Sequence, residues 1–117
     1  MTKTHVSAGN VEIELDSETV TLRPSLKAAQ NISRMKGGVM AAVEAVGRFD
    51  FDVLVNVIAL GIGAEGKEAR ELPEKVYATG MADLVTPVIT YLTTIANGGR
   101  PVLESTGGEG EENPPGN

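Results

Sequence analysis

The segment that most constrains this chain is the nearly unbroken apolar run FDVLVNVIALGI, residues 51–62, which only Asp52 and Asn56 interrupt. It is too short to span a bilayer, which takes about 20 residues as a helix, so the rest of the chain must bury it. As a helix it would be about 18 Å long and apolar almost all round. As a strand, its valines and isoleucines would suit a sheet covered on both faces. Periodicity alone does not separate the two.

Composition excludes several classes of site. The chain has 117 residues, no cysteine and one histidine, His5. Disulfides, thiolate metal sites, histidine-based triads and multi-histidine zinc sites are therefore excluded. The net charge is −6 and the basic residues are spread out, which argues against nucleic-acid binding. We expect a soluble cytoplasmic protein that does not bind a membrane, because neither a signal sequence nor a run of 18 apolar residues is present.

The first structured element is predicted to be a β-hairpin at about 10–23. Val11, Ile13 and Leu15 alternate with acidic residues, and a second alternating run follows the turn at 16–18. This period of two is typical of strands with one buried face. We interpret Glu12 and Glu14 as a solvated face rather than an acidic binding surface.

Helical spacing dominates the chain after Pro24. Ser25 is a candidate N-cap, and Asp50 and Asp52 are interpreted as caps of the central segment rather than as an acid/base pair. In the first helix, Leu26, Ala29, Ile32 and Met35 are expected to point inward. The helices are predicted at about 26–35, 38–47, 51–63, 73–79 and 82–97.

Two prolines and a polar segment shape the last part of the prediction. Residues 63–71 are glycine-rich and charged and are expected to form a loop, with Pro73 in the first turn of the next helix. Pro87 lies inside the best helical pattern of the chain, so it should bend that helix or mark its start. Residues 104–117 hold four Glu but no Lys, Arg or aromatic residue, which predicts a disordered acidic tail.

The predicted fold class is therefore α+β: a mainly helical small domain with an N-terminal β-hairpin, spanning residues 1–103, followed by the disordered tail. No catalytic residue, metal site or bound cofactor is predicted.

A glycine-rich segment matches two nucleotide-binding patterns. Residues 61–66 fit G-x-G-x-x-G, and Gly61 to Lys67 fit G-x-x-x-x-G-K. However, Glu68 stands where a P-loop carries Ser or Thr, and Pro73 interrupts the helix that should follow. Only about 50 residues come after the motif, too few for the repeated βαβ units of a dinucleotide fold. We interpret the segment as a structural loop and keep nucleotide binding as a distant alternative.

The order of elements resembles a known family. A short hairpin runs into LRPSLKAAQNI and a short helix, and FDFDVLVNVIALGIG forms the apolar helix. A glycine-rich loop, an amphipathic helix ending in NGG and an acidic tail follow. Over roughly residues 10–100 this layout resembles the small tail assembly chaperones of tailed phages, prophages and the gene transfer agents of α-proteobacteria.

The resemblance implies a protein-binding role without catalysis. Such chaperones associate with the tape-measure protein and with tail-tube protein during tail assembly in the bacterial cytoplasm. The alternative is a structural tail component that stays in the particle. Flexible methionines suit adaptable binding surfaces, and two apolar residues lie beside the acidic tail. The candidate partner-binding residues are accordingly Met35, Met40, Met81, Val102 and Leu103. The last two could instead pack back onto the domain.

Overall fold

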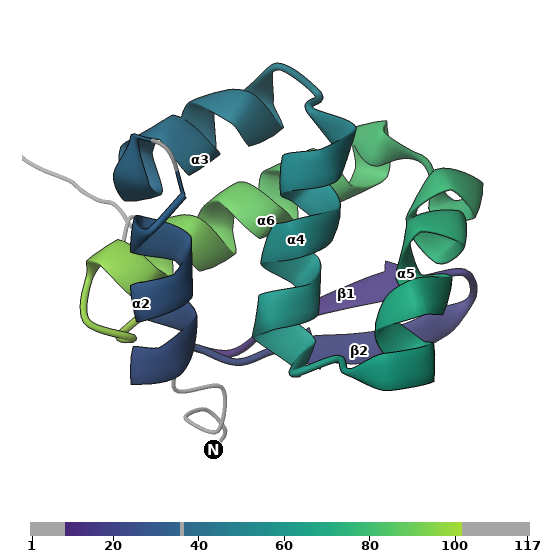
Figure 1. The fold of residues 1–117 in the computed structure, drawn as a ribbon, viewed down its shortest axis with the longest axis horizontal. Coiled ribbons are helices and arrows are strands. Elements are labelled where there is room, and N and C mark those ends of the chain that lie inside the picture. The colour runs from purple at the N-terminus through teal and green to yellow at the C-terminus, as the bar shows by residue number, and fades with distance from the viewer. Residues whose placement is uncertain (1–8, 36, 102–117) are drawn as a thin grey trace, which may run out of the picture.

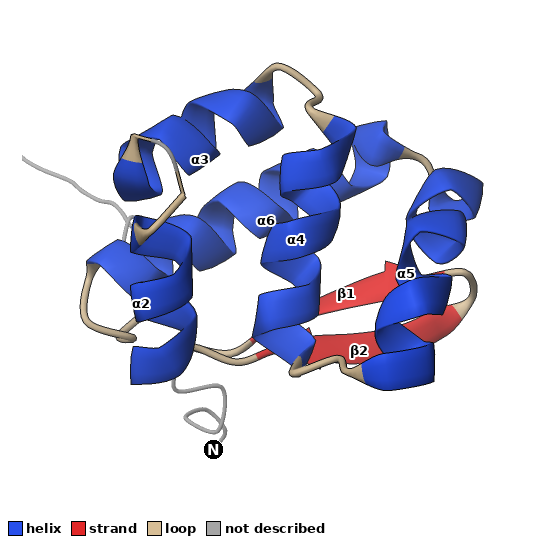
Figure 2. Ribbon diagram, viewed as in Figure 1, coloured by secondary structure: helices blue, strands red, loops and turns tan. Residues whose placement is uncertain are grey.

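The computed structural model describes residues 9–35 and 37–101, which form an antiparallel β-hairpin and five helices (Figures 1 and 2). The predicted α+β, mainly helical fold with its N-terminal hairpin is confirmed. The tail predicted for residues 104–117 lies outside the described residues. In chain order the elements are β1 (Val11–Leu15), β2 (Glu18–Leu22), α2 (Leu26–Ser33), α3 (Gly38–Gly47), α4 (Phe51–Ile62), α5 (Gly66–Thr79) and α6 (Met81–Ala96).

The hairpin follows the alternation in its sequence. Ile13 and Leu15 on β1 are buried, as is Leu22 on β2, while the two glutamates interleaved on β1 are exposed. The strands are joined by a two-residue turn in which Asp16 has φ 52° and Ser17 has φ 72°. Positive φ at both central residues is the type I′ geometry that matches the twist of paired strands. One face of the hairpin is thus available to pack on the helices.

The apolar segment at the centre of the sequence forms helix α4. Asp50 caps it, because its Oδ1 accepts the Val53 N–H at 3.2 Å. Leu54, Val57 and Ile58 are fully buried, and α4 packs against β2 and all four other helices of the described chain (Figure 1). Its residues are therefore buried by helices and one hairpin, which explains how so apolar a helix occurs in a small domain.

Helix α3 ends in a Schellman motif with an unusual residue. The N–H of Phe49 donates to the carbonyl of Val46, and the N–H of Asp50 donates to the carbonyl of Ala45 at 2.9 Å. Phe49 occupies the left-handed position, with φ 66°, where glycine is the usual residue. Its side chain remains 47% exposed. The turn between α3 and α4 therefore holds an aromatic residue in a conformation that costs free energy for any side chain with a Cβ.

Helix α2 begins as predicted but differs in its buried face. Ser25 is the N-cap, and its Oγ accepts the Ala28 N–H at 3.0 Å. Ala28 and Ile32 are buried. The prediction that Leu26 points inward is wrong, because this first residue of the helix is 74% exposed. The helix ends at Ser33, two residues before the predicted end.

The prediction of a loop at 63–71 is wrong over most of its length. Helix α5 begins at Gly66, seven residues before the predicted start at Pro73, which lies inside the helix. Leu72 and Val76 are buried, and this apolar face holds the helix on the rest of the domain. Helix α6 begins at Met81 and continues through Pro87, so this proline does not mark its start.

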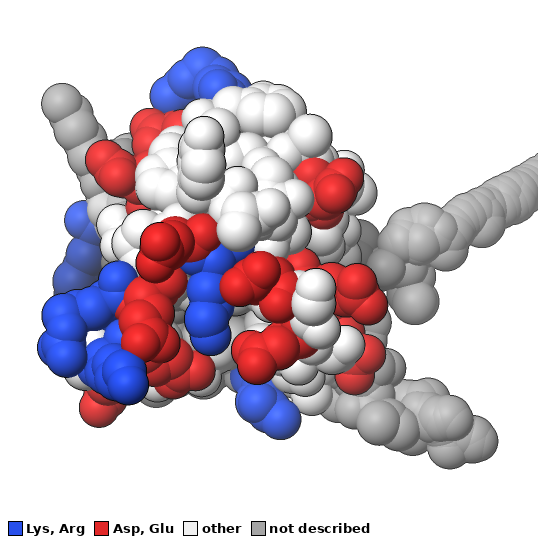
Figure 3. Space-filling view, turned by 90° about the vertical axis from the view of Figure 1, so that its right-hand side faces the viewer, with Lys and Arg blue, Asp and Glu red and all other residues white. Residues whose placement is uncertain are grey.

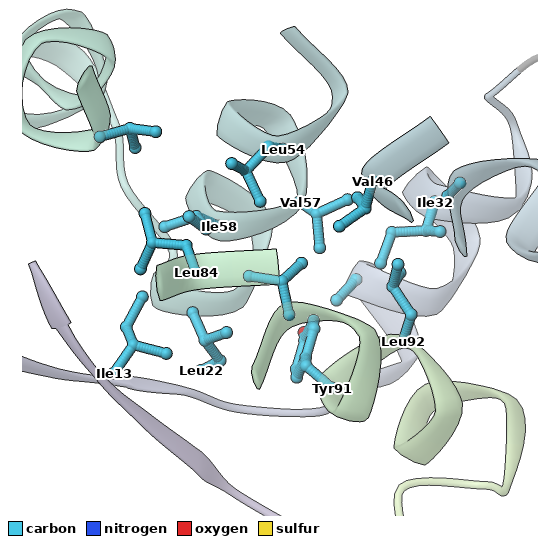
Figure 4. Packing of buried hydrophobic residues seen from close by; sticks show 14 of the residues in the cluster. Ile13, Leu22, Ile32, Val46, Leu54, Val57, Ile58, Leu84, Tyr91 and Leu92 are labelled. Carbon is cyan, nitrogen blue, oxygen red and sulfur yellow. The ribbon is translucent and has the colours of Figure 1, made fainter. Parts of the chain in front are cut away.

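The core lies between α4, α6 and the hairpin (Figure 4). Side chains from β1, β2 and all five helices of the described chain point into one cluster, in which Tyr91 is the largest fully buried residue. Ten members are labelled in Figure 4: Ile13, Leu22, Ile32, Val46, Leu54, Val57, Ile58, Leu84, Tyr91 and Leu92. Across the described part of the chain, no helix has both the length and the apolar character needed to cross a membrane.

Candidate partner-binding surface

The structure separates the three methionines that the sequence singles out. Met35 lies in the turn after α2, where its carbonyl accepts the Gly38 N–H at 2.8 Å, and Met40 lies in the first turn of α3. Met81 opens α6, beside the end of α5 and on the other side of the molecule (Figure 1). We call Met35, Gly37, Gly38 and Met40 the methionine corner. Val102 and Leu103 lie outside the described residues.

The three methionines also differ in exposure. Met40 has 65% of its surface exposed. Met35 and Met81 are half-buried and pack against the core cluster. Flexible thioether side chains adapt to varied apolar partners, but only when they are accessible. Among the candidates in the described residues, Met40 is therefore the best placed to contact a partner.

A groove runs between α2 and the end of α4. Its volume is about 290 Å³, and its apolar lining includes Ala28, Ala59, Leu60 and Ile62. Two basic residues, Arg23 and Lys27, and one acidic residue, Glu65, also line it. The apolar part of the lining consists of small and branched side chains, which is the chemistry that accepts the apolar face of a helix. The sequence did not predict this groove because its two walls come from elements about 30 residues apart.

A second groove lies at the start of α2, and we call it the terminal groove. It has a volume of about 430 Å³ and brings the start of α2 next to the loop after α6. The exposed side chain of Leu26 forms part of its wall. No sequence signal marked this groove, because the helical spacing of Leu26 predicted burial. It is lined by Asn10, Pro24, Ser25, Leu26, Ala29, Ile95, Gly98 and Gly99.

The face carrying α5 and the hairpin turn bears many acidic side chains with basic ones among them (Figure 3). Both kinds gather over the lower half of this view, where the acidic ones are more numerous, whereas the centre of the upper half is uncharged. A cleft of about 410 Å³ between the hairpin and the α5–α6 connection is lined by Glu12, Glu14, Asp16 and Asp83. Two basic residues lie close to carboxylates here, with Lys75 Nζ 3.6 Å from Glu18 and Lys67 Nζ 3.9 Å from Glu71. This face disfavours nucleic acid, because it would repel a phosphate backbone.

The buried hydroxyl of Tyr91 serves the fold. It donates a hydrogen bond to the Arg23 carbonyl at 2.8 Å, and the Arg23 N–H donates to the Gly61 carbonyl at 2.9 Å. Burial raises the pKa of Tyr91 from 10.0 to about 12. Leu22 packs against Gly61, so these four residues join the hairpin to α4 and α6. We call Leu22, Arg23, Gly61 and Tyr91 the hairpin junction.

The glycines of the nucleotide-like motif have structural roles. Gly61 lies within α4, and a Cβ there would be 2.9 Å from Leu22 Cδ2, so the close approach of the hairpin requires glycine. Gly63 ends α4 in the left-handed conformation with φ 71°. A helix precedes the motif where both nucleotide-binding patterns need a strand.

Two further observations bear on function. Among residues 9–35 and 37–101, no three His, Cys, Asp or Glu side chains are grouped so that they could hold a metal ion. Comparison of the chain with family models, with curated proteins and with solved structures finds no match. The function of this chain must therefore be inferred from its surface and from the resemblance in element order.

Proposed function

We propose that this chain is a phage-type tail assembly chaperone that binds tape-measure protein, tail-tube protein or both during tail assembly. The observation that carries the proposal is the exposure of Met40 at the methionine corner of a small helical domain. The proposed role is non-enzymatic and is carried out in the cytoplasm of the bacterial host cell.

The chemistry of the surface supports this role. A tape-measure protein of the kind implied by the resemblance presents long apolar helical stretches, which aggregate in water unless they are covered. The groove between α2 and α4 has the apolar lining to take such a helix, and charged side chains beside the apolar stripe would face Arg23, Lys27 and Glu65. Met40 supplies an adaptable apolar contact at the turn between α2 and α3, at the opposite end of α2 from the groove.

The decisive experiment compares two samples from one source. Quantitative mass spectrometry would measure the protein in a lysate during assembly and in purified mature particles. A chaperone leaves when the tube forms, so it should be abundant in the lysate and absent from the particles. A fixed number of copies per particle would overturn the proposal and favour a structural tail component.

A solubility assay tests the binding itself. Segments of the tape-measure protein would be co-expressed with this chain, and the soluble fraction of the segments would be measured. We expect the wild-type chain to raise that fraction, and the Met40→Ser variant to raise it less. If the chain left the soluble fraction unchanged, the chaperone role would be rejected.

The nucleotide alternative has a separate test. Calorimetric titration with ATP and with NAD should show no saturable binding, because the glycines of the 61–67 segment are used in helix ends and packing. Saturable binding that the Lys67→Ala variant abolished would revive the alternative.

A further inference from the structure

The end of the described chain is held beside the terminal groove. After α6, the Asn97 side-chain amide donates to the carbonyl of Arg100 at 3.2 Å and to that of Pro101 at 3.4 Å, which turns the chain back. A Cβ at Gly99 would be 3.5 Å from the Cβ of Pro24, so the loop lies against the start of α2. The loop that leads to Val102 and Leu103 therefore borders the groove through Gly98 and Gly99.

The length and the apolar character of the Val102–Leu103 pair both suit the terminal groove. Two extended residues span about 7 Å, so the Val102–Leu103 pair is long enough to enter a groove whose lining includes Gly99 and Gly98, three and four positions before Val102. Leu26, 74% exposed, provides an apolar wall. Tethering by so short a link also gives the pair a local concentration in the millimolar range, so weak contacts suffice.

The charges on and beside α2 oppose those of the tail, and two of them, Arg23 and Lys27, line the neighbouring groove between α2 and α4. Residues 19–43 contain no Asp or Glu, their described basic residues are Arg23, Lys27 and Arg34, and Arg100 lies in the loop after α6. No ion pair among the described residues involves these four. The tail after Leu103 carries four glutamates and no basic residue. Attraction between α2 and the tail is therefore not offset by acidic residues on α2.

We propose that the C-terminal segment docks on its own domain, with Val102 and Leu103 in the terminal groove and the glutamates that follow beside the basic surface of α2. The acidic face on the hairpin side would repel the same segment, so docking is confined to the α2 side. This inference does not depend on the proposed function, because it concerns one chain and needs no partner.

The test is methyl NMR on the full chain. We expect nuclear Overhauser effects between the Leu103 methyls and those of Leu26 or Ile95, together with altered Leu26 shifts in a Val102→Ser/Leu103→Ser variant. Both substituted residues lie outside the described domain core, so the fold should be kept, and backbone amide spectra would verify this. Absence of the effects together with unchanged Leu26 shifts would overturn the proposal.

Two controls test whether a second copy of the chain fills the groove and whether charge contributes to docking. A sample mixing two differently labelled chains would show the same contacts only if a second copy filled the groove, and that result would also overturn the proposal. Lys27→Glu should lower the docked-to-free ratio by about two- to fivefold, as expected for one exposed ion pair, whereas Lys67→Glu on the acidic side should not. Equal effects of the two variants would contradict the assignment of the glutamates to α2.

Discussion

At the hairpin junction, Leu22 and Tyr91 are fully buried and packed closely enough that Gly61 has no room for a side chain. At the methionine corner, Met40 keeps 65% of its surface exposed and the chain passes through two glycines with φ 87° and 75°. The junction joins elements that are far apart in the chain and buries its apolar side chains in the core, whereas the corner joins the consecutive helices α2 and α3 and leaves Met40 in water. Substitutions at the junction should therefore act on stability, and substitutions at Met40 should act on binding.

The largest effect is expected at the contact between β2 and α4. Leu22→Ala should lower the free energy of unfolding by about 2–5 kcal/mol, because it leaves a cavity in the core. Gly61→Ala should cost about 1–3 kcal/mol, because the new methyl group meets Leu22 at 2.9–3.3 Å. Urea denaturation would measure both.

The double variant sharpens this prediction. The Leu22→Ala change removes Leu22 Cδ2, the atom closest to a methyl group added at Gly61, but keeps the Cβ and Cα at 3.0 and 3.3 Å. The two costs should therefore add only in part, with a coupling of about 0.5–3 kcal/mol. Additive costs would show that the contact with Leu22 Cδ2 does not limit the substitution at Gly61. Ala59→Gly, on the half-buried side of the same helix, would control for helix propensity.

The second prediction is a loss of folding stability at high pH. The pKa of Tyr91 is raised to about 12 in the folded chain, whereas a tyrosine in the unfolded chain has its ordinary pKa of 10.0. The folded state therefore holds the proton more tightly. The stability that this supplies is complete below pH 10 and is lost between pH 10 and pH 12, by about 2–3 kcal/mol. Denaturation midpoints across this range would measure the loss.

Two phenylalanine variants separate the contribution of Tyr91 from that of other groups that lose protons at high pH. At neutral pH, Tyr91→Phe should be less stable than wild type by about 1–3 kcal/mol, because the Arg23 carbonyl loses its partner. The difference from wild type should shrink as the pH rises through 12. Tyr77→Phe, at a position 81% exposed, should follow the wild-type curve throughout. A constant difference at Tyr91 would contradict the pH prediction.

The β-hairpin and the exposed residues of α2 and α3 also differ in how well the sequence predicts them. Alternation in 11–15 places Ile13 and Leu15 inward, because a strand has a period of two whatever covers it. The bounds of α3 follow from its helical spacing and flanking glycines. The exposure of Leu26 and Met40 depends instead on which helix packs where, and no local pattern contains that information.

Helix α5 shows the same limit for a whole element. Glycines and charges between 63 and 71 suggest a loop, yet Lys67 Nζ lies 3.9 Å from Glu71 on one helical face, and Leu72 with Val76 supplies the buried contact. Tertiary burial thus extends the helix to Gly66 despite Pro73, which removes one backbone hydrogen bond. The two grooves could not be predicted for the same reason, since each needs walls from separate elements.

On the exposed side, a substitution at Phe49 is expected to raise stability. Glycine at this left-handed position relieves about 1–2 kcal/mol of strain, while its greater freedom in the unfolded chain costs about 0.5–1 kcal/mol. Phe49→Gly should therefore gain about 0.5–1 kcal/mol in thermal denaturation. Phe49→Ala keeps the strain and should gain nothing, so equal gains in the two variants would refute the backbone explanation.

The smallest effect on stability is expected at Met40, and it is the one that most directly tests the comparison. Met40→Ser should change the free energy of unfolding by less than about 0.5 kcal/mol, because the side chain is mostly in water. Its affinity for a tape-measure segment should fall about five- to thirtyfold, the equivalent of about 1–2 kcal/mol of lost apolar burial. Met81→Ser is the matched control: it removes a half-buried contact with the core and should cost stability while leaving affinity unchanged. Fluorescence anisotropy with a labelled segment and urea denaturation would separate the two readouts. Loss of affinity at Met81 with none at Met40 would move the binding surface to the other side of the molecule, where α5 meets α6.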